Sequence, residues 1–230
     1  MLVRNWMSKN VITIEEDDSM QWASALMREH QIRMLPVMRK GQLTGIVSSS
    51  DLKRASASDA TMLDIHELLY LISKIKVVDI MSKNPITVPE DFTVEETAQV
   101  LMDNNISGVP VLSYHGNLVG VITRDDIIKI LISLSGLGKK GVQLAFQVDD
   151  RSGSIKVLTD IIRKYDARVA SILSNYENTP EGTRIVYIRI YETNPFVMPD
   201  LIRELRENGS LIYIVDHREN KRQIFLDTKA

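Results

Sequence analysis

The sequence predicts a mixed α+β protein in which two tandem β-α-β-β-α units are followed by a domain of order β-α-β-β-α-β. Three observations lead to this expectation: an internal repeat in residues 1–134, a segment rich in glycine and lysine after it, and a new pattern of apolar runs beyond that segment. The chain has 230 residues, 44% hydrophobic and 25% charged, which is ordinary for a globular protein and enough for two or three small domains.

The repeat becomes visible when the sequence is shifted by 74 residues. MSKNVIT at 7–13 then falls on MSKNPIT at 81–87. One inserted residue later in the unit makes the shift 75. Matches that extend over a whole unit, with a single gap at a turn, indicate a tandem duplication. Further equivalent pairs are Ile32 and Ile106, Pro36 and Pro110, Gly45 and Gly120, and Asp51 and Asp126.

Each unit has the same expected order of elements. In the second unit, a short apolar segment at 86–88 precedes a helix that begins at the capping-box pair Thr93 and Glu96. Two strands at 109–112 and 118–122 follow, joined by a glycine turn, and then a helix over 126–134. We expect the first of these helices to bury its apolar residues Val94, Ala98, Leu101 and Met102.

These patterns define the domain boundaries. The first unit covers 1–58 and the second 77–134, with a bridging helix expected at 59–76, where apolar residues recur at helical spacing. SGLGKKG at 135–141 is a linker by composition. Residues 142–216 alternate strand and helix patterns in the ferredoxin-like order β-α-β-β-α-β. The remaining residues, 217–230, form a charged tail without an assigned element.

One motif in each unit indicates binding chemistry. It reads GIVSSSD at 45–51 and GVITRDD at 120–126, so that Ser48 and Asp51, like Thr123 and Asp126, form a capping box. Capping alone accounts for these residues. However, amides at the start of a helix also bind anions, and an aspartate at the end of a strand accepts hydrogen bonds from ribose hydroxyls. Together with the apolar residues upstream, the motif suits an adenosine phosphate, and both roles can coexist.

These motifs resemble those of the cystathionine-β-synthase (CBS) domain family. The shared features, present in both units, are MSKN-x-IT, I-x-x-h-P-V and G-h-h-[ST]-x-x-D, where h is an apolar residue. The resemblance implies a tandem CBS pair, or Bateman module, that regulates another activity and binds AMP, ADP, ATP or S-adenosylmethionine in two clefts. It implies that the first cleft is formed by Thr13, Ile32, Leu35, Pro36, Ser48 and Asp51, and the second by Thr87, Ile106, Val109, Pro110, Thr123, Arg124 and Asp126.

The two implied clefts differ in the size of their residues. The first unit has Arg33 and Met34 where the second has Ser107 and Gly108. We expect the bulkier side chains to narrow the first cleft, so that the second binds nucleotide better. Arg124, present in the second unit alone, is the expected phosphate contact.

The C-terminal domain resembles an ACT domain, a ferredoxin-like module that often binds amino acids at a dimer interface. The supporting residues are Asp150 and Gly153 in the first strand-to-helix loop, which the resemblance implies as an amino-acid site. A plain tight turn explains the glycine about as well, and Ser152 stands where many members of the family have proline. The order of two CBS domains followed by an ACT domain resembles the acetoin-utilisation B proteins of bacteria.

Composition excludes several other classes of function. A net charge of −2 argues against a broadly basic nucleic-acid binder, and the absence of cysteine excludes thiolate chemistry. The four histidines are scattered, so no metal cofactor is expected. No apolar run reaches the length of a membrane span and no signal peptide is recognisable, so we expect a cytoplasmic protein.

Two hypotheses of function follow. The first is a non-catalytic sensor that forms a homodimer, binds an adenine nucleotide or S-adenosylmethionine in the CBS pair, and passes the signal to the ACT domain or a partner. The second is a sensor of an amino or hydroxy acid through the ACT domain, with the CBS pair as a dimerisation scaffold. An enzyme is not expected, because the three modules occupy nearly the whole chain.

Overall fold

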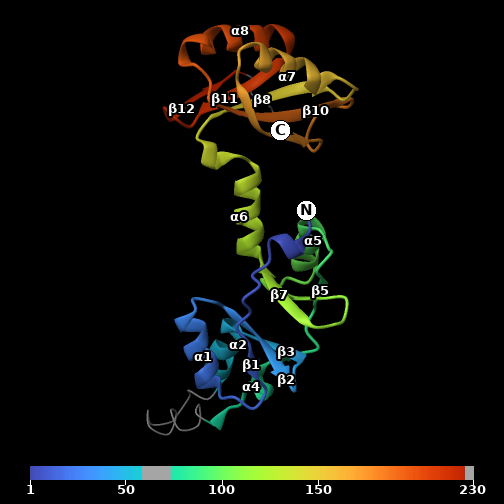
Figure 1. Cartoon of the computed structure of the whole chain (residues 1–230), viewed down its shortest axis with the longest axis vertical. Coiled ribbons are helices and arrows are strands. Elements are labelled where there is room, and N and C mark those ends of the chain that lie inside the picture. Colours follow the sequence, from blue (N-terminus) through green and yellow to red (C-terminus); the bar gives the residue numbers. More distant parts are fainter. Residues whose placement is uncertain (59–73, 226–230) are drawn as a thin grey trace. The chain divides into compact units, whose positions relative to one another are not determined.

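The computed structural model describes residues 1–58 and 74–225, and the side chains of 56–58 are outside the description. The expected bridging helix at 59–76 therefore lies almost entirely outside the described residues. The chain divides into two compact units, Met1–Ile128 and Lys129–Ala230. Figure 1 labels the helices and strands of each unit.

The first repeat builds a four-stranded sheet with helices packed on one face. The sheet has the order β1-β2-β3-β4, with β1 parallel to β2 and the other pairs antiparallel. Its core includes Leu35, Val37 and Val47, each 0% exposed. The elements are η1 (Val3–Asn5), β1 (Ile14–Glu15), α1 (Met20–Glu29), β2 (Met34–Arg39), β3 (Gln42–Ser48), α2 (Ser49–Ser58), α4 (Val77–Ile80) and β4 (Ser82–Lys83).

The second repeat has the same order of elements around a three-stranded sheet, β5-β6-β7. Its elements are β5 (Val88–Pro89), α5 (Val94–Asp103), β6 (Gly108–Leu112), β7 (Leu118–Thr123) and α6 (Arg124–Leu134). The predicted β-α-β-β-α order is confirmed in both repeats. The first strand of each repeat, β1 or β5, begins two residues after the start of the apolar segment that predicted it.

The expectation that α5 buries Met102 is wrong. Val94 and Leu101 are buried, but the Met102 side chain is 70% exposed, and Thr97 is 0% exposed. Val94, Thr97 and Leu101 form one helical stripe, and Met102 lies about 100° farther around the helix. Burial of Thr97 is tolerated because its hydroxyl donates a hydrogen bond to the Thr93 carbonyl over 3.0 Å.

The segment that precedes each repeat pairs with the other repeat. Val3 donates its amide hydrogen to the Phe92 carbonyl, and the equivalent Val77 donates to the Asp18 carbonyl, over 2.8 and 2.9 Å. Farther along, Ser8 bridges to β7, while Ser82 in β4 pairs with β3. The first residues of each repeat thus pair with the other repeat: residues 82–83 add β4 to the first sheet, and Ser8 forms an isolated bridge to β7 of the second.

Two methionines explain the glycine at the start of each GIVSSSD-type motif. Met81 lies against Gly45, and the equivalent Met7 lies against Gly120. A Cβ atom at Gly120 would be 2.2 Å from the Met7 sulfur, and a Cβ at Gly45 would be 2.5 Å from the Met81 sulfur. These distances are shorter than any van der Waals contact, so a side chain at either glycine would force the methionine that packs on it to move.

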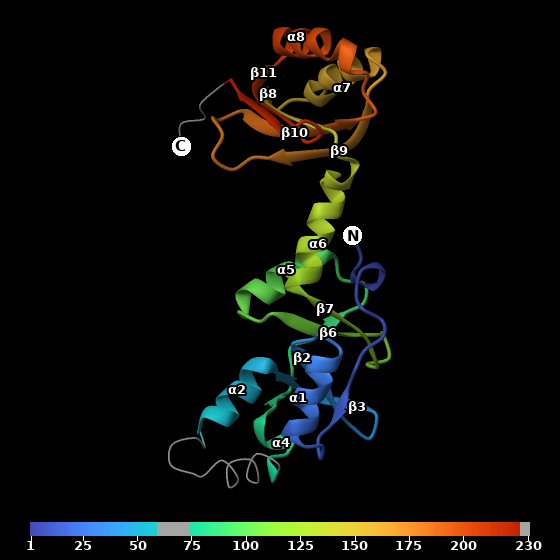
Figure 2. The same cartoon turned by 90° about the vertical axis from the view of Figure 1, so that its left-hand side faces the viewer.

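The second unit is a five-stranded antiparallel sheet of order β12-β11-β8-β10-β9. The helices α7 and α8 lie on the same face of this sheet in both views (Figures 1 and 2). The ferredoxin-like β-α-β-β-α-β order is present, and β12, within the unassigned tail, adds a strand beside β11. The elements are η2 (Leu137–Lys139), β8 (Val142–Asp149), α7 (Ser154–Lys164), β9 (Arg168–Asn175), β10 (Thr183–Tyr191), η3 (Pro195–Val197), α8 (Met198–Asn208), β11 (Ser210–Asp216) and β12 (Lys221–Ile224).

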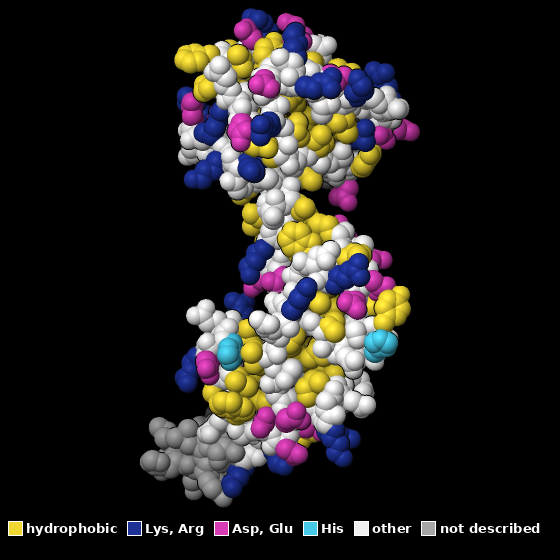
Figure 3. All heavy atoms as spheres, in the orientation of Figure 1, with side chains coloured by type: hydrophobic (Ala, Val, Ile, Leu, Met, Phe, Trp, Pro, Cys, Tyr) yellow, Lys and Arg dark blue, Asp and Glu magenta, His cyan; other side chains and the backbone are white. Residues whose placement is uncertain are grey.

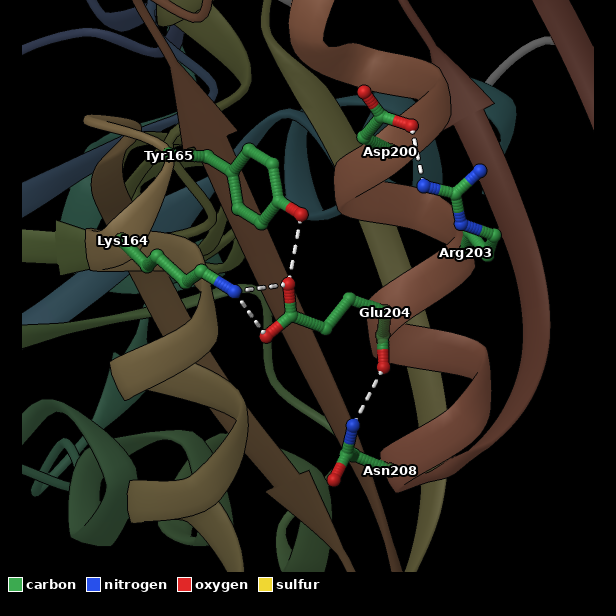
Figure 4. A network of polar contacts seen from close by, with 6 residues as sticks. All are labelled: Lys164, Tyr165, Asp200, Arg203, Glu204 and Asn208. Carbon is green, nitrogen blue, oxygen red and sulfur yellow. Dashed lines mark hydrogen bonds and ion pairs between the residues drawn. The ribbon is translucent and has the colours of Figure 1, made fainter.

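A polar network ties α7 to α8 at the surface above the core of this unit (Figure 4). The Glu204 carboxylate accepts hydrogen bonds from the Lys164 ammonium over 2.8 Å and from the Tyr165 hydroxyl over 2.7 Å. These bonds, first the one from Lys164 and then the one from Tyr165, lower the pKa of Glu204 against the opposing effect of burial. The network therefore stabilises the ionised form of Glu204.

Replacing Gly120 with alanine should destabilise the first unit, because the new methyl group overlaps the Met7 side chain. The expected loss is about 1–3 kcal/mol in the free energy of unfolding, measured by urea denaturation. The control is Gly138→Ala, since a Cβ at Gly138 meets no atom within 4 Å. Equal stability of the two variants would show that Met7 does not require glycine at this position.

Replacing Glu204 with glutamine should destabilise the second unit at neutral pH and much less in acid. Because the folded-state pKa of Glu204 is lowered, its stabilisation is fully present above its ordinary pKa of about 4.3 and is lost as pH falls through the folded value. Thermal denaturation at about pH 7 and at about pH 3 would measure the difference. Glu207→Gln, an exposed position on the same helix, is the control; a pH-independent difference would contradict the prediction.

Candidate ligand-binding site

The two capping boxes predicted from the sequence are present with nearly the same geometry. In the second repeat, the Asp126 carboxylate accepts hydrogen bonds from the Thr123 amide over 3.0 Å and from the Thr123 hydroxyl over 2.7 Å. In the first repeat, the Asp51 carboxylate accepts the equivalent bonds from Ser48 over 2.8 and 2.6 Å. Each aspartate thus lies in the first turn of a helix that directly follows a strand.

The backbone brings a second wall of each predicted cleft beside the capping box. The Arg124 amide donates to the Ser107 carbonyl over 2.9 Å, and Gly108 pairs with Thr123 across β6 and β7. The first repeat has the equivalent bond, from the Ser49 amide to the Arg33 carbonyl, also over 2.9 Å. The end of α5, the start of β6 and the start of α6 therefore converge at one point, as do their counterparts.

The apolar residues predicted to line the clefts differ in accessibility. Leu35 and Val109 are 0% exposed, so their side chains belong to the interior and are not available to a ligand. Ile32 and Ile106 are half-buried and directly follow α1 and α5. The remaining predicted residues comprise Pro36 and Pro110, which are buried, Thr87, which is half-buried, and Thr13, which is exposed.

Met34, expected to narrow the first cleft, reaches into the second repeat. A Cβ atom on Gly108 would be 2.9 Å from the Met34 methyl carbon and 3.0 Å from the Thr123 methyl group. The Met34 side chain therefore fills the space left by Gly108, close to the capping box of the second repeat. The sequence predicted that Met34 narrows the first cleft, because it does not show how the two repeats pack against each other.

Arg124, the predicted phosphate contact, is engaged by the end of α5. Its guanidinium donates to the Leu101 carbonyl over 3.0 Å and to the Asn105 side-chain oxygen over 3.4 Å. The same carbonyl also accepts the Ile106 amide hydrogen over 3.0 Å, so Arg124 adds a second bond to a carbonyl near the end of α5. A contact between Arg124 and phosphate stays a prediction.

The aspartate of the first repeat is more deeply buried than that of the second. Arg54, one turn along α2, forms an ion pair with Asp51, and Asp51 is 7% exposed. Asp126 is half-buried. An open groove of about 600 Å³ lies beside the first repeat between α1 and α2 and takes in Ile32 and Ser49.

In the second unit, the predicted Asp150 and Gly153 lie in the loop between β8 and α7. Gly153 adopts a left-handed conformation with φ of 89° immediately before α7. The Arg184 guanidinium lies 3.6 Å from the Asp150 carboxylate and donates to the Ser154 hydroxyl over 3.2 Å. Gly153 therefore allows a tight turn before α7, and the Arg184 guanidinium lies near this turn.

Charged side chains of both signs are mixed over the surface of each unit. Lysine and arginine side chains are interspersed with aspartate and glutamate on the face of each unit shown in Figure 3. Over residues 1–58 and 74–225, no three histidine or acidic side chains are grouped so as to hold a metal ion. Within the same residues, no helix has the length and apolarity needed to cross a bilayer.

The chain belongs to the CBS-domain family. The family model described as CBS domain matches residues 3–58 and 77–133, the two repeats. A CBS domain-containing protein of Dictyostelium discoideum is 33% identical over 135 residues, which cover 58% of this chain and 93% of that protein. Other relatives are longer enzymes, such as the inosine-5'-monophosphate dehydrogenase of Korarchaeum cryptofilum, 35% identical over 119 residues, or 52% of this chain and 22% of the enzyme.

Solved structures resemble the same region. A Vibrio cholerae protein described as an acetoin utilization protein (AcuB) overlaps with a TM-score of 0.51 and 26% identity, covering 60% of this chain and 96% of that one. The CBS domain pair of protein MJ0100, in complex with 5'-methylthioadenosine and S-adenosyl-L-methionine, gives a TM-score of 0.49 and 32% identity over 57% of this chain and 95% of that one. At that TM-score the overlap assigns no ligand to the present chain.

Replacing Thr123 with valine should cost about 1 kcal/mol of stability, because the hydroxyl that caps α6 is lost. Chemical denaturation would measure the change. Thr13→Val, at an exposed position that precedes β1, is the control with the same chemical change. If both variants unfolded at the same denaturant concentration as the parent, the Thr123 cap would contribute nothing to stability.

Proposed function

We propose that this protein is a regulatory sensor whose CBS pair binds an adenosine-containing ligand: AMP, ADP, ATP or S-adenosylmethionine. The observation that supports this most is the duplicated arrangement in which a carboxylate and the first amides of a helix meet at the end of a strand. The carboxylate suits ribose hydroxyls, and the amides suit a phosphate. Asp126 is half-buried, so its carboxylate is partly accessible to a ligand.

The second repeat is the preferred binding site. Asp51 is nearly inaccessible and is paired with Arg54, so a ribose would have to displace an ion pair to reach it. Asp126 is more accessible. Met34 lies beside this motif, and its flexible thioether can repack against a purine at little cost.

Regulation requires that the ligand favours one arrangement of the protein over another. We propose that binding changes the packing between the two repeats, which exchange their preceding segments, and that the change acts on the C-terminal domain or on a partner protein. A cytoplasmic homodimer without catalytic activity of its own suits this role. The likeness to the Vibrio cholerae protein supports a function in acetoin utilization.

A second candidate function is sensing of a small amino or hydroxy acid by an ACT-like C-terminal domain. The observation that favours it is the loop at Gly153, where Arg184 could bind a carboxylate next to the start of α7. In that case the CBS pair would act as a dimerisation scaffold. Calorimetric titration of the whole chain with the four adenosine ligands and with a panel of amino acids distinguishes the two functions.

Replacing Asp126 with alanine should weaken binding of the adenosine ligands by about tenfold or more, because a hydrogen bond to a charged group is lost. Asp51→Ala should weaken it less. Asp125→Ala, an exposed carboxylate in the same helical turn, is the matched control. Isothermal titration calorimetry provides the dissociation constants.

Unchanged affinity in Asp126→Ala, together with a lower melting temperature, would restrict Asp126 to helix capping. Absence of heat from every adenosine ligand, with a response to an amino acid, would favour the second candidate function. Equal losses for Asp125→Ala and Asp126→Ala would indicate a general effect of charge and contradict the proposed site.

A further inference from the structure

The face of the C-terminal sheet opposite α7 and α8 contains a buried arginine. Arg189, in the central region of β10, is 4% exposed. Its Nε donates to the Ser135 carbonyl over 2.7 Å, and one Nη donates to the Gln143 side-chain oxygen over 3.1 Å. The other, Nη1, is buried and has no hydrogen-bond partner. Among the described residues, no carboxylate pairs with Arg189.

This arrangement is costly because a buried charge is normally paired with an opposite charge. Two neutral oxygens bond to the guanidinium, and its third nitrogen bonds to none. Burial accordingly lowers the pKa of Arg189 below the ordinary arginine value. An anion at Nη1 would supply both the missing charge and the missing acceptor.

A second orphaned nitrogen lies on the residue that follows β11. His217 donates its amide hydrogen to the Gly141 carbonyl, which fixes it at the end of the sheet. Its Nε2 is buried and has no partner. Burial, followed by the charges of Arg189 and Arg222, lowers the pKa of His217. The lowered pKa favours the neutral imidazole, whose Nε2 donates a hydrogen bond when it carries the ring hydrogen.

We propose that Arg189 and His217 form a binding site for a small monocarboxylate on this face of the sheet. Arg189 and Val215 both pair with Gln143, so His217, two residues beyond Val215, lies on the same face of the sheet as Arg189. Two donor nitrogens on one face suit the two oxygens of a carboxylate. A phosphate would bring more charge and more oxygens into a buried site than a carboxylate, which costs more desolvation. This site lies apart from the CBS motifs and from the loop at Gly153, so it does not depend on the proposed function.

The neighbouring residues suit a ligand with a short apolar body. Ala145 is 0% exposed and pairs with both Tyr187 and Tyr213, whose ring centres are 6.4 Å apart. Tyr213 lies near enough to Arg189 for the guanidinium charge to oppose the effect of burial on the pKa of the tyrosine. Aromatic faces beside a cationic centre favour an aliphatic 2-oxo or 2-hydroxy acid over a larger polar anion.

The linker provides the route of entry. Both orphaned nitrogens are inaccessible, so a ligand enters when the segment over Arg189 moves. Gly136 lies against the Arg189 side chain, and the ammonium of Lys139 lies 5.1 Å from the Tyr191 ring centre. Residues 137–140 are exposed, but Ser135 accepts bonds from Arg189 and Ser171, so entry requires those bonds to break.

Titration of the whole chain with pyruvate tests the site, with sodium chloride and inorganic phosphate as comparison anions at equal ionic strength. We expect saturable binding of pyruvate by calorimetry and a shift of the Arg189 Nε–H signal in the ¹H–¹⁵N spectrum. That signal is assigned by its loss in Arg189→Lys. His217→Phe, which removes the donor and retains a ring, should weaken binding roughly tenfold, as for one lost hydrogen bond to a charged group.

The matched control is His115→Phe, at an exposed turn in the other unit, which should bind pyruvate like the parent. Absence of saturation at millimolar pyruvate, or equal affinity in His217→Phe and the parent, would overturn the proposal. So would equal effects of chloride, phosphate and pyruvate, which would indicate a water-filled or unspecific site. Titration of the same variants with AMP tests the CBS pair separately, so failure of one site does not obscure the other.

Discussion

The packing of Met7 on Gly120 and of Met81 on Gly45 is the constraint on which the first unit depends. In each case a side chain that precedes one repeat occupies the space above a glycine in the other repeat. The backbone bonds from Val3 and Val77 follow the same exchange. The first residues of each repeat therefore pack and hydrogen-bond with the other repeat, which joins the two repeats within one compact unit.

This exchange assigns separate roles to the parts of the duplicated motif. The glycine serves packing between the repeats, while Ser48 or Thr123 and the following aspartate serve the start of a helix. None of these roles requires a ligand. The binding capacity arises because a strand passes directly into a helix, so that capping groups and helix amides are exposed at one point. Folding and ligand binding therefore require the same residues. The presence of these residues alone does not show whether they serve the fold or a ligand.

The parts of the fold that could be predicted are those set by local rules. Glycine turns, capping boxes and alternating apolar residues gave the element order of both repeats and of the C-terminal domain. Contacts between distant segments could not be predicted, since nothing local indicates that Met7 packs on Gly120. Local rules also failed at Met102, which was included in the buried apolar stripe although it is exposed. They failed at β12 as well, whose four residues KRQI are all exposed and include three polar side chains.

The same distinction applies to the candidate sites. The capping boxes at Ser48 and Thr123 were found from spacing, whereas the burial of Leu35 and Val109 depends on which face of the sheet the helices cover. Arg189 is the clearest failure of sequence reasoning. Its place in the alternating strand TRIVYIRIY predicts a solvated side chain, because the neighbours Ile188 and Ile190 face the core. Its burial results from the Ser135 carbonyl that covers it.

A nucleotide and a second ligand can change each other's affinity only if both of them shift the conformation of the same structural element. The segment from Thr123 to Ser135 meets this requirement through its connectivity. Its first turn is held by the bonds between Thr123 and Asp126, and the carbonyl of the residue after α6 accepts bonds from Arg189 and from the Ser171 hydroxyl. An anion at Arg189 would draw the guanidinium away from Ser135, and a nucleotide at Asp126 would alter the cap at the other end. The two ligands would then act on one helix from opposite ends.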